Sequence, residues 1–485
     1  MNFAIINYSK VKDSTKLFRF DAEYFHPTYL KTENLIKKRT YSELRSLIDL
    51  LTDYHANGSY EILRKNVVLK QKPDFAHMIR TVDIERDDFE NDIICVSERA
   101  YHFLVKTKVY GGEIIINKIG NAGKVYLVPP VNRETTLGMN QFMIRTKTGV
   151  DNYCLYCYLA GRHGQKQLSQ RITGAVPLSI DKESVKSVLV PHFSNHFKNF
   201  INSIVRNHFT KIRSAKNLYS QVNNDSLKEL NLSGWFPKHK LGFSKNLSSL
   251  QISERVDAEY FQPKFDEIVN HIKEYGVSYD SLDNLVEMKK CIEPGSAAYQ
   301  EIGIPFIRVS NLSKFEISDS DPKYISENLY SELITHQPKK GEILFTKDAT
   351  PGIAYYLDKE PIKMIPSGGI LRLKIKDENK IKPEYLTLVL NSILVQQQML
   401  RDAGGSIIKH WRPDQIKATL IPILDEKKQL GIQSKLQESF DCRAKSKQLI
   451  EIAKRGVEMA IEKDETKAKN WINEEVEKLG VELNE

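Results

Sequence analysis

One nine-residue stretch occurs twice in this chain and constrains its architecture more than any other feature. Residues 19–27 read RFDAEYFHP and residues 255–263 read RVDAEYFQP, so seven of nine positions are identical. The second copy begins 236 residues after the first. A repeat at so long a period indicates that a whole structural unit occurs twice, and it constrains the architecture before any local pattern is considered.

Further pairs of segments follow at nearly the same spacing. Residues 112–118 (GEIIINK) match residues 341–347 (GEILFTK), and a turn containing glycine follows each of them, which is typical of a β-hairpin. Glycine-bearing loops near residues 171–176 and 401–406 come next. In each half a short segment ending in proline then precedes a long stretch with apolar residues at three- and four-residue steps. This period predicts a long amphipathic helix in each half.

The pattern therefore predicts an α+β fold built by tandem duplication: a mixed α/β domain, a long helix, a second mixed domain and a second long helix. Each helix is amphipathic along one seam, and such a seam usually packs against a similar helix. The simplest partner for each is the helix of the other half, in an antiparallel coiled coil. We expect domains at 1–191 and 255–422, a helix and linker at 192–254, and a helix with an acidic tail at 423–485.

Length and composition narrow the class of protein. At 485 residues the chain is expected to hold two to four domains, and 41% hydrophobic with 27% charged residues is typical of a soluble globular protein. No apolar run approaches the roughly 18 residues of a membrane helix, and no signal peptide is evident, so we expect a cytoplasmic protein without membrane contact. The net charge of +9 permits an acidic partner such as DNA without requiring one.

The five cysteines predict neither a disulfide framework nor a zinc site. Cys154 and Cys157 have the spacing of a metal knuckle, but they lie in an apolar run that predicts a buried helix. Buried free thiols are therefore the expectation, with no metal and no cofactor.

Catalytic motifs are missing from the sequence or stand in the wrong context. There is no phosphate-binding loop, no dinucleotide fingerprint, and no Asn/Asp-Pro-Pro-aromatic signature of amino-methylating DNA methyltransferases. Asp414, Glu426 and Lys428 formally match a metal-dependent nuclease pattern. However, Glu426 is predicted to open the second long helix, whereas that pattern requires a strand. A metal-dependent DNA nuclease and a coiled-coil scaffold without DNA contact are the alternatives to a DNA-binding protein.

Basic and amide side chains on predicted loops and strand ends favour DNA binding. Arginine and lysine contact phosphates and guanine, and asparagine contacts adenine. The candidate DNA-binding residues are Arg80, Lys118, Asn121, Lys124, Arg162, Lys166 and Arg171 in the first half, and Arg308, Asn311, Lys347, Arg372, Lys409 and Arg412 in the second.

The doubled order of these motifs resembles the specificity subunit of type I restriction-modification enzymes. The two RxDAEYFxP stretches, the two GEI hairpins and the proline-ended segments before long helices carry this resemblance, which covers nearly the whole chain. It implies that residues 1–191 and 255–422 are target-recognition domains, each reading one half of a bipartite site on double-stranded DNA. The conserved helices would form a spacer between them.

The resemblance also implies partners. A specificity subunit is not an enzyme itself. It docks methyltransferase (modification) subunits, expected to number two, and a restriction/translocase subunit, and the complex defends the cell against foreign DNA through DNA methylation. A helix of about 30 residues is roughly 45 Å long, which would separate the half-sites by about one turn of DNA or slightly more at ~3.4 Å per base pair.

The repeated stretch itself is expected to serve the common framework or subunit docking. The two halves are expected to read different DNA sequences. Residues that are identical in both halves therefore cannot determine which sequence each half reads. Its tyrosine and phenylalanine residues are expected to pack inside, and the tail at 465–485 is expected to form a capping helix.

Overall fold

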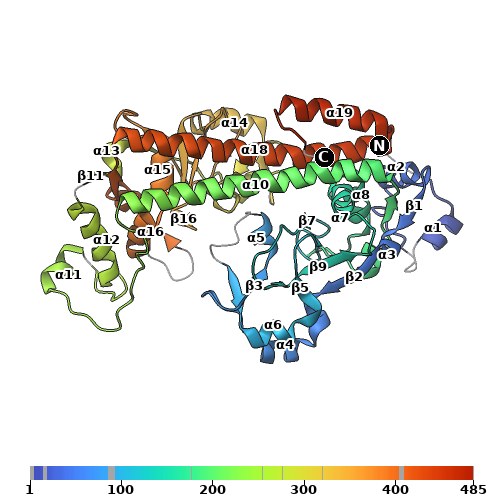
Figure 1. The fold of residues 1–485 in the computed structure, drawn as a ribbon, viewed down its shortest axis with the longest axis horizontal. Coiled ribbons are helices and arrows are strands. Elements are labelled where there is room, and N and C mark those ends of the chain that lie inside the picture. Colours follow the sequence, from blue (N-terminus) through green and yellow to red (C-terminus); the bar gives the residue numbers. More distant parts are fainter. Residues whose placement is uncertain are drawn as a thin grey trace. The chain divides into compact units, whose positions relative to one another are not determined.

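The computed structural model divides into two compact units. Unit 1 contains residues 1–212 and 443–485, and unit 2 contains residues 213–442. The long helices α10 (Asn195–Glu229) and α18 (Glu426–Glu462), green and red in Figure 1, each contribute residues to both units. The structure describes residues 5–14, 19–85, 93–175, 177–253, 255–275, 277–318, 321–403 and 409–483.

Unit 1 is built on two four-stranded sheets. The first contains, in spatial order, β2 (Ile48–Asp53), β9 (Gln141–Thr146), β6 (Ile114–Asn117) and β7 (Val125–Leu127). The second contains β4 (Ile94–Val96), β3 (Ala76–Ile79), β8 (Thr135–Leu137) and β5 (Lys108–Val109), with β3 and β8 parallel. Strands β6 and β7 pair antiparallel, so the predicted hairpin is confirmed in this unit.

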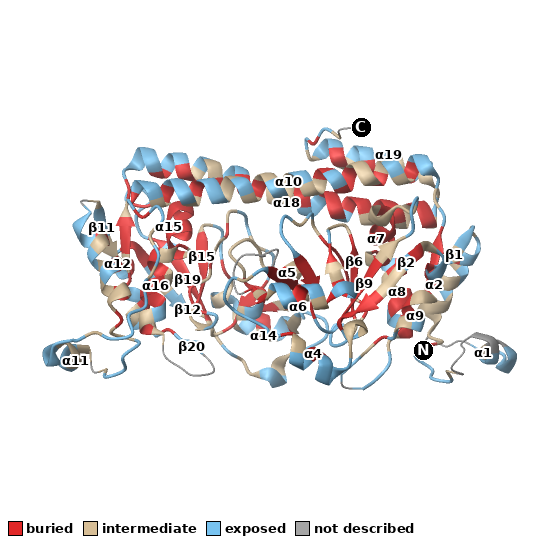
Figure 2. Ribbon diagram, turned by 60° about the horizontal axis from the view of Figure 1, so that its bottom comes forward, coloured by how far each residue is buried: buried red, intermediate tan, exposed pale blue. Residues whose placement is uncertain are grey.

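The core of unit 1 follows from the alternation of side chains along the strands. Ile114 and Ile116 of β6 point to the same face of the sheet and share one core with α7 (Asn152–Ala160). Figure 2 shows the buried residues of β6, β9 and α7 in red. Cys154 and Cys157 are buried free thiols, as predicted, and burial raises the pKa of the Cys157 thiol to about 12.

Unit 1 also contains shorter helices and a two-stranded antiparallel sheet of β1 (Tyr41–Glu43) and β10 (Leu189–Pro191). The helices are α1 (Tyr8–Ser14), α2 (Pro27–Lys37), α3 (Leu44–Leu47), α4 (Tyr60–Asn66), α5 (Thr81–Glu85), α6 (Glu98–Phe103), α8 (Arg162–Arg171) and α9 (Lys182–Lys186).

Unit 2 contains a sheet with the same order of strands. It runs β12 (Val286–Lys290), β19 (Ile370–Ile375), β15 (Glu342–Thr346) and β17 (Ala354–Tyr356). A second sheet contains β14 (Lys323–Ile325), β13 (Ile304–Ile307) and β18 (Ile365–Pro366), with β13 and β18 parallel as β3 and β8 are. Strands β11 (Ser278–Ser281) and β21 (Leu420–Ile423) pair as β1 and β10 do.

Unit 2 also contains shorter helices, and one of them, α15, contributes the fully buried Tyr385 to the core. They are α11 (Leu247–Ser253), α12 (Pro263–Glu274), α13 (Leu282–Leu285), α14 (Glu327–Glu332), α15 (Pro383–Leu390), α16 (Ile393–Asp402) and α17 (Pro413–Lys417). The expected mixed α+β composition and the expected long helices are thus confirmed. Among the described residues, none of the helices combines the length and apolarity needed to cross a membrane.

Helices α10 and α18 run antiparallel where they meet in each unit. In unit 2, Lys428 contacts Glu229 at 2.8 Å and Lys435 contacts Asp225 at 3.2 Å, so rising numbers on α18 meet falling numbers on α10. In unit 1, Ile201 of α10 shares a core with α18 residues that include Val457. Apolar residues of both helices, among them Ile201 and Val457 in unit 1 and Val222 and Ile432 in unit 2, belong to the buried core of their unit.

The acidic tail forms α19 (Glu465–Lys478), which packs in unit 1. Its Ile472 is fully buried against Gly456 of α18, where an added Cβ would lie 2.3 Å from the Ile472 Cδ1 atom. The carboxylate of Glu465 accepts a hydrogen bond of 2.9 Å from the main-chain N–H of Ser194, just before α10. The tail is therefore helical, as expected, and satisfies a donor at the start of α10.

The repeated stretch makes the same turn in both units. The guanidinium of Arg19 donates to both carboxylate oxygens of Asp21 at 2.8 Å, and that of Arg255 donates to both oxygens of Asp257 at 2.7 Å. The Arg19 hydrogen bonds lower the pKa of Asp21. Each of the paired aspartates is thus bound by an arginine two residues away, which supports a framework role.

The expectation that the aromatic residues of this stretch pack inside is correct for only one of them. Tyr24 is buried, with its ring 4.7 Å from the Arg19 guanidinium carbon. Phe25, Tyr260 and Phe261 are half-buried. The turn lies near the surface of each unit, so only part of each ring is covered.

Candidate nucleic-acid interface

In unit 1, one carboxylate joins two lysines at an edge of the first sheet. Strand β2 ends at Asp53, Lys118 follows β6, and Lys182 begins α9. The Nζ atom of Lys118 lies 3.1 Å from Oδ2 of Asp53, and Nζ of Lys182 lies 2.9 Å from Oδ1. Both ammonium groups also lie near the buried ring of Phe142, at 5.6 and 5.9 Å from its centroid.

The two lysines keep Asp53 ionised although it is only 6% exposed. Burial raises the pKa of the Asp53 carboxyl, but hydrogen bonds from Lys182 and Lys118 outweigh burial, so the pKa is lowered overall. Two ammonium groups and one carboxylate leave an excess of one positive charge at this edge.

The corresponding edge of unit 2 also carries a lysine beside an aspartate. Lys347 follows β15, and its ammonium group contacts Asp348 in β16 (Asp348–Ala349). Strand β16 pairs with β20 (Lys409–His410), where Nδ1 of His410 lies 2.9 Å from Oδ1 of Asp348. Lys409 is exposed, and Arg412 is 69% exposed with Asp414 at 3.4 Å.

The same main-chain hydrogen bond closes both edges. The N–H of Ile180 donates to the main-chain oxygen of Lys118 at 3.0 Å, and the N–H of Trp411 donates to that of Lys347 at 2.8 Å. In each unit the segment after the glycine-bearing loop is thereby held beside the hairpin lysine. Residue 176 and residues 404–408, within the expected loops, lie outside the described residues.

Arg80 and Arg308 also occupy matching places, directly after β3 and β13. The main-chain N–H of Arg80 donates to Asp83 at 2.7 Å, and that of Arg308 donates to Asn311 at 3.1 Å. The Arg80 guanidinium reaches Asp83 at 2.6 Å, whereas the Arg308 guanidinium reaches Asp321 at 2.9 Å. Asp83 and Asn311 are themselves buried.

Two candidate arginines lie inside their units. Arg171 donates to the Ser187 hydroxyl at 2.8 Å and to the Gln167 main-chain oxygen at 2.8 Å, and burial lowers its pKa. Arg372 is 4% exposed and donates to both carboxylate oxygens of Glu342, at 2.8 and 2.9 Å. These guanidinium groups therefore bind acceptors of the protein itself.

The remaining candidates of unit 1 are spread over several elements. Arg162 pairs with Glu458 and Glu462 of α18. Lys124 lies 3.4 Å from Glu85 and over the ring of Tyr126, Asn121 is exposed in the turn after β6, and Lys166 is half-buried in α8. Only Lys118, Asn121 and Lys124 thus share one hairpin.

The structure adds two side chains to this interface that the candidate set lacks. Lys182 joins Lys118 through Asp53, and His410 joins Lys347 through Asp348. Both lie in the segment that follows the glycine-bearing loop in their half. A search of that segment for lysine, arginine and histidine would have identified both residues from the sequence.

The nuclease pattern is not assembled into a metal site. Asp414 is 69% exposed beside Arg412, Glu426 begins α18, and Lys428 pairs with Glu229. Within the described ranges, no group of three or more His, Cys, Asp and Glu side chains is arranged to hold a metal ion.

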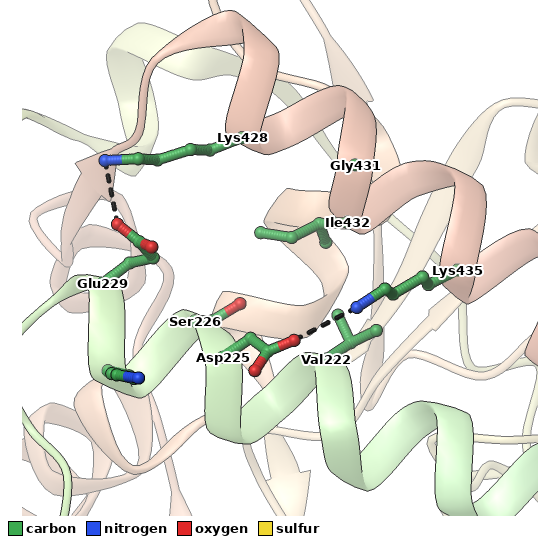
Figure 3. A pocket seen from close by; sticks show the side chains of 9 residues that line it. Val222, Asp225, Ser226, Glu229, Lys428, Gly431, Ile432 and Lys435 are labelled. Carbon is green, nitrogen blue, oxygen red and sulfur yellow. Dashed lines mark hydrogen bonds and ion pairs between the residues drawn. The ribbon is translucent and has the colours of Figure 1, made fainter.

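A pocket of about 280 Å³ lies between α10 and α18 within unit 2 (Figure 3). Ion pairs between Lys428 and Glu229 and between Lys435 and Asp225 cross it. Because its charges are paired across the gap, we assign it to helix packing and not to the interface. Its lining residues are Val222, Asp225, Ser226, Lys228, Glu229, Lys428, Gly431, Ile432 and Lys435.

Two solved structures are similar over nearly their whole length. The S subunit of a type I restriction-modification system from M. genitalium is 12% identical, with 92% of this chain and 96% of that chain covered and a TM-score of 0.31. The HsdS subunit from Thermoanaerobacter tengcongensis is 13% identical, with 88% and 97% covered and a TM-score of 0.27.

Because these TM-scores are low, neither structure is used to support the fold of this chain. No curated protein sequence gives a match. Residues 279–453, which run from β11 through much of α18, match the family model of the type I restriction modification DNA specificity domain. Residues 279–453 are therefore similar to that specificity domain, which bears out the resemblance predicted from the repeated motifs.

Proposed function

We propose that this chain is the non-catalytic, sequence-specific DNA-binding subunit of a type I restriction-modification complex. The observation that carries the proposal is the specificity-domain match over residues 279–453. The order of strands in unit 1 repeats the order in unit 2, which supports extending the role to both halves. Each half would then read one half of a bipartite site on double-stranded DNA.

The proposal includes a tandem duplication. The target-recognition domains would comprise residues 1–191 and 255–422, and the spacer helices would lie in 192–254 and 423–485. Three pairs of matching features support it: the Arg19 and Arg255 turns, the arginines after β3 and β13, and the hydrogen bonds to the main-chain oxygens of Lys118 and Lys347. Loops of different length between these features would read different half-sites.

We further propose that α10 and α18 form an antiparallel coiled-coil spacer that sets the distance between the half-sites. They contain 35 and 37 residues, so each is about 50 Å long at ~1.5 Å per residue. A four-residue insertion in both helices should lengthen the DNA spacer and leave the half-sites unchanged. An unaltered spacer would exclude the helices as the ruler.

DNA contact is assigned to the candidates that reach the surface. Phosphate and base contacts require side chains that solvent can reach, so Arg171, Arg372 and Asn311 are better suited to holding the framework. Arg162 is exposed, but it is left out of the contact set because it pairs with Glu458 and Glu462 of α18. The proposed contact residues are Arg80, Lys118, Asn121, Lys124 and Lys166 in unit 1, and Arg308, Lys347, Lys409 and Arg412 in unit 2.

The partners of the proposed complex are two methyltransferase subunits and a restriction/translocase subunit. The exposed carboxylates of Glu23 and Glu259, which stand at the same place in the two repeated turns, offer two matching surfaces for one kind of partner. A partner used twice requires matching surfaces, whereas the DNA half-sites differ.

Methylation mapping tests the function directly. The methylated motifs of the host genome are compared between the intact strain, a strain without this gene, and the same strain with the gene restored. We expect one bipartite motif to lose its methylation and to regain it on restoration. An unchanged methylome in a strain that expresses the gene would overturn the proposal.

A further inference from the structure

We propose that Asp53 is a positioning residue that holds Lys118 and Lys182 as a two-lysine clamp for one phosphate of the DNA backbone. The inference rests on the proposed DNA-binding function and deepens it, because it adds Lys182 as a contact residue. It also assigns Asp53 a role that is exerted through the two lysines and not through direct contact with DNA.

The donors of the clamp match an oxyanion. An ammonium group has three N–H donors and no acceptor. Asp53 receives a hydrogen bond from each of the two lysines, at 3.1 and 2.9 Å, so donors remain on both. The side chains of Lys118 and Lys182 are 31% and 37% exposed, so both lie partly at the surface of unit 1. A base edge presents donors as well as acceptors, whereas phosphate oxygens only accept.

The number of charges around Asp53 favours a phosphate-binding clamp over an ion pair that only stabilises the fold. One lysine would neutralise Asp53, which is only 6% exposed. The second lysine brings a like charge to the same carboxylate and leaves an excess of one positive charge. A phosphate placed between the two ammonium groups would balance that excess charge.

The surroundings fix the clamp before DNA arrives. Lysine side chains are flexible, and ordering them on binding costs free energy. Here the two ammonium groups donate to different oxygens of the nearly buried Asp53 carboxylate. Both ammonium groups also lie 5.6–5.9 Å from the centroid of the buried Phe142 ring. The hydrogen bond from Ile180 to the main-chain oxygen of Lys118 holds the segment leading to Lys182 beside the hairpin.

The first test compares Lys182→Ala with Lys186→Ala. Both lysines lie in α9, but Lys186 pairs with Glu183 at 2.9 Å and is a matched control. DNA binding by the full chain, assembled with its methyltransferase partners, is measured over a salt series. The probes are a duplex carrying the mapped site and an unrelated duplex of the same length.

For Lys182→Ala we expect affinity for both duplexes to fall on the order of fivefold to tenfold at 0.1 M salt, and the slope of log K against log salt to shrink by about 0.9. Lys186→Ala should change neither quantity. An unchanged slope for Lys182→Ala would overturn the clamp, and a loss confined to the mapped duplex would indicate base reading instead. Loss of inorganic phosphate binding with an unchanged DNA slope would indicate a free-anion site.

If the unsubstituted complex binds neither duplex, the proposed function itself fails.

The second test isolates Asp53. Asp53→Asn removes a negative charge, so electrostatics alone predicts tighter DNA binding. The positioning role predicts the opposite: several-fold weaker binding to both duplexes, with partial rescue in Asp53→Glu. Circular dichroism at the assay temperature confirms that each variant is folded. Tighter binding by a folded Asp53→Asn variant would overturn the positioning role.

Discussion

Ser446 of α18 donates its hydroxyl hydrogen to the main-chain oxygen of His208 in α10, at 3.0 Å, within unit 1. Seven residues away on each helix, Ser439 donates to the main-chain oxygen of Ala215 at 2.7 Å, within unit 2. Both serines are buried, at 0% and 2% exposure. A small residue that reaches the backbone of the facing helix permits a close approach of the two helices within each unit.

Enlarging either serine should destabilise the packing of the two helices. Ser446→Leu places a bulky side chain where a hydroxyl meets the backbone, and such overpacking costs about 1–3 kcal/mol. Ser446→Ala removes the contacts of the hydroxyl with the main-chain oxygen and with Nδ1 of His208, and each hydrogen bond lost should cost about 0.5–1.5 kcal/mol. Urea unfolding measures both, with Ser220→Leu at an exposed position of α10 as the control. Equal effects of Ser446→Leu and Ser220→Leu would show that the helices are not packed closely at Ser446.

Two glycines of α18 should respond to alanine with opposite signs. At Gly431 an added Cβ meets nothing within 4 Å, so Gly431→Ala should stabilise the helix by about 0.5–1 kcal/mol. At Gly456 the Cβ would lie 2.3 Å from the Cδ1 atom of buried Ile472, so Gly456→Ala should destabilise unit 1 by about 1–3 kcal/mol.

Limited proteolysis locates the effect of the Gly456 substitution. Displacement of α19 should speed trypsin cleavage after Lys463 in Gly456→Ala and leave the cleavage rate unchanged in Gly431→Ala. Equal protection together with equal thermal stability would contradict the packing of α19 against Gly456.

The sequence predicted the features that depend on local pattern. The 3.6-residue apolar period predicted both long helices, and the glycine-bounded runs predicted the β6–β7 hairpin. The apolar run around Cys154 predicted buried thiols, because no polar face interrupts it. Repetition made these predictions stronger, since each pattern had to hold twice.

Contacts between distant residues were beyond such patterns. Asp53, at the end of β2, meets Lys118 and Lys182 only after the chain folds, because these lysines lie 65 and 129 residues further along the sequence. The sequence of β19 alternates apolar and basic residues, which suggests a solvent-facing side, but Lys374 is its only exposed residue. Arg372 instead points inward to acceptors on Glu342 and Thr335. The sequence alone does not distinguish a charged side chain that faces solvent from one that pairs with a buried carboxylate.

Removing the Arg372 guanidinium should be costly because its partner stays behind. Arg372→Met leaves the carboxylate of Glu342 buried at 4% exposure without its bidentate partner, and breaking such a pair costs about 3–5 kcal/mol. Urea unfolding of the variant measures the loss. Arg412→Met, at a 69% exposed position, should stay within about 0.5 kcal/mol of the unsubstituted chain. Adding Glu342→Gln to Arg372→Met should recover part of the loss, and no recovery would contradict an uncompensated charge as its cause.

His163 should make unit 1 less stable as the solution is acidified through pH 6. Its ring is 5% exposed, Nε2 lies 2.9 Å from Glu462, and burial lowers its pKa in the folded chain, with the Glu462 contact acting in the opposite direction. In the unfolded chain histidine titrates near 6.5. The contribution is therefore fully present above about pH 6.5 and is lost as the pH falls toward the lower folded value, since the unfolded chain then binds more protons.

The measurement compares urea midpoints between pH 8 and pH 5.5 for the unsubstituted chain, His163→Gln and His102→Gln. His102 is 62% exposed and controls for the loss of a histidine at the surface. We expect His163→Gln to flatten the decline in stability between pH 7 and pH 5.5, and His102→Gln to leave it unchanged. Glu462, whose pKa is lowered by its hydrogen bonds from His163 and Arg162 against the effect of burial, titrates below this window and does not contribute to the slope. An identical slope in His163→Gln would show that the buried imidazole gains its proton as readily in the folded chain as in the unfolded one.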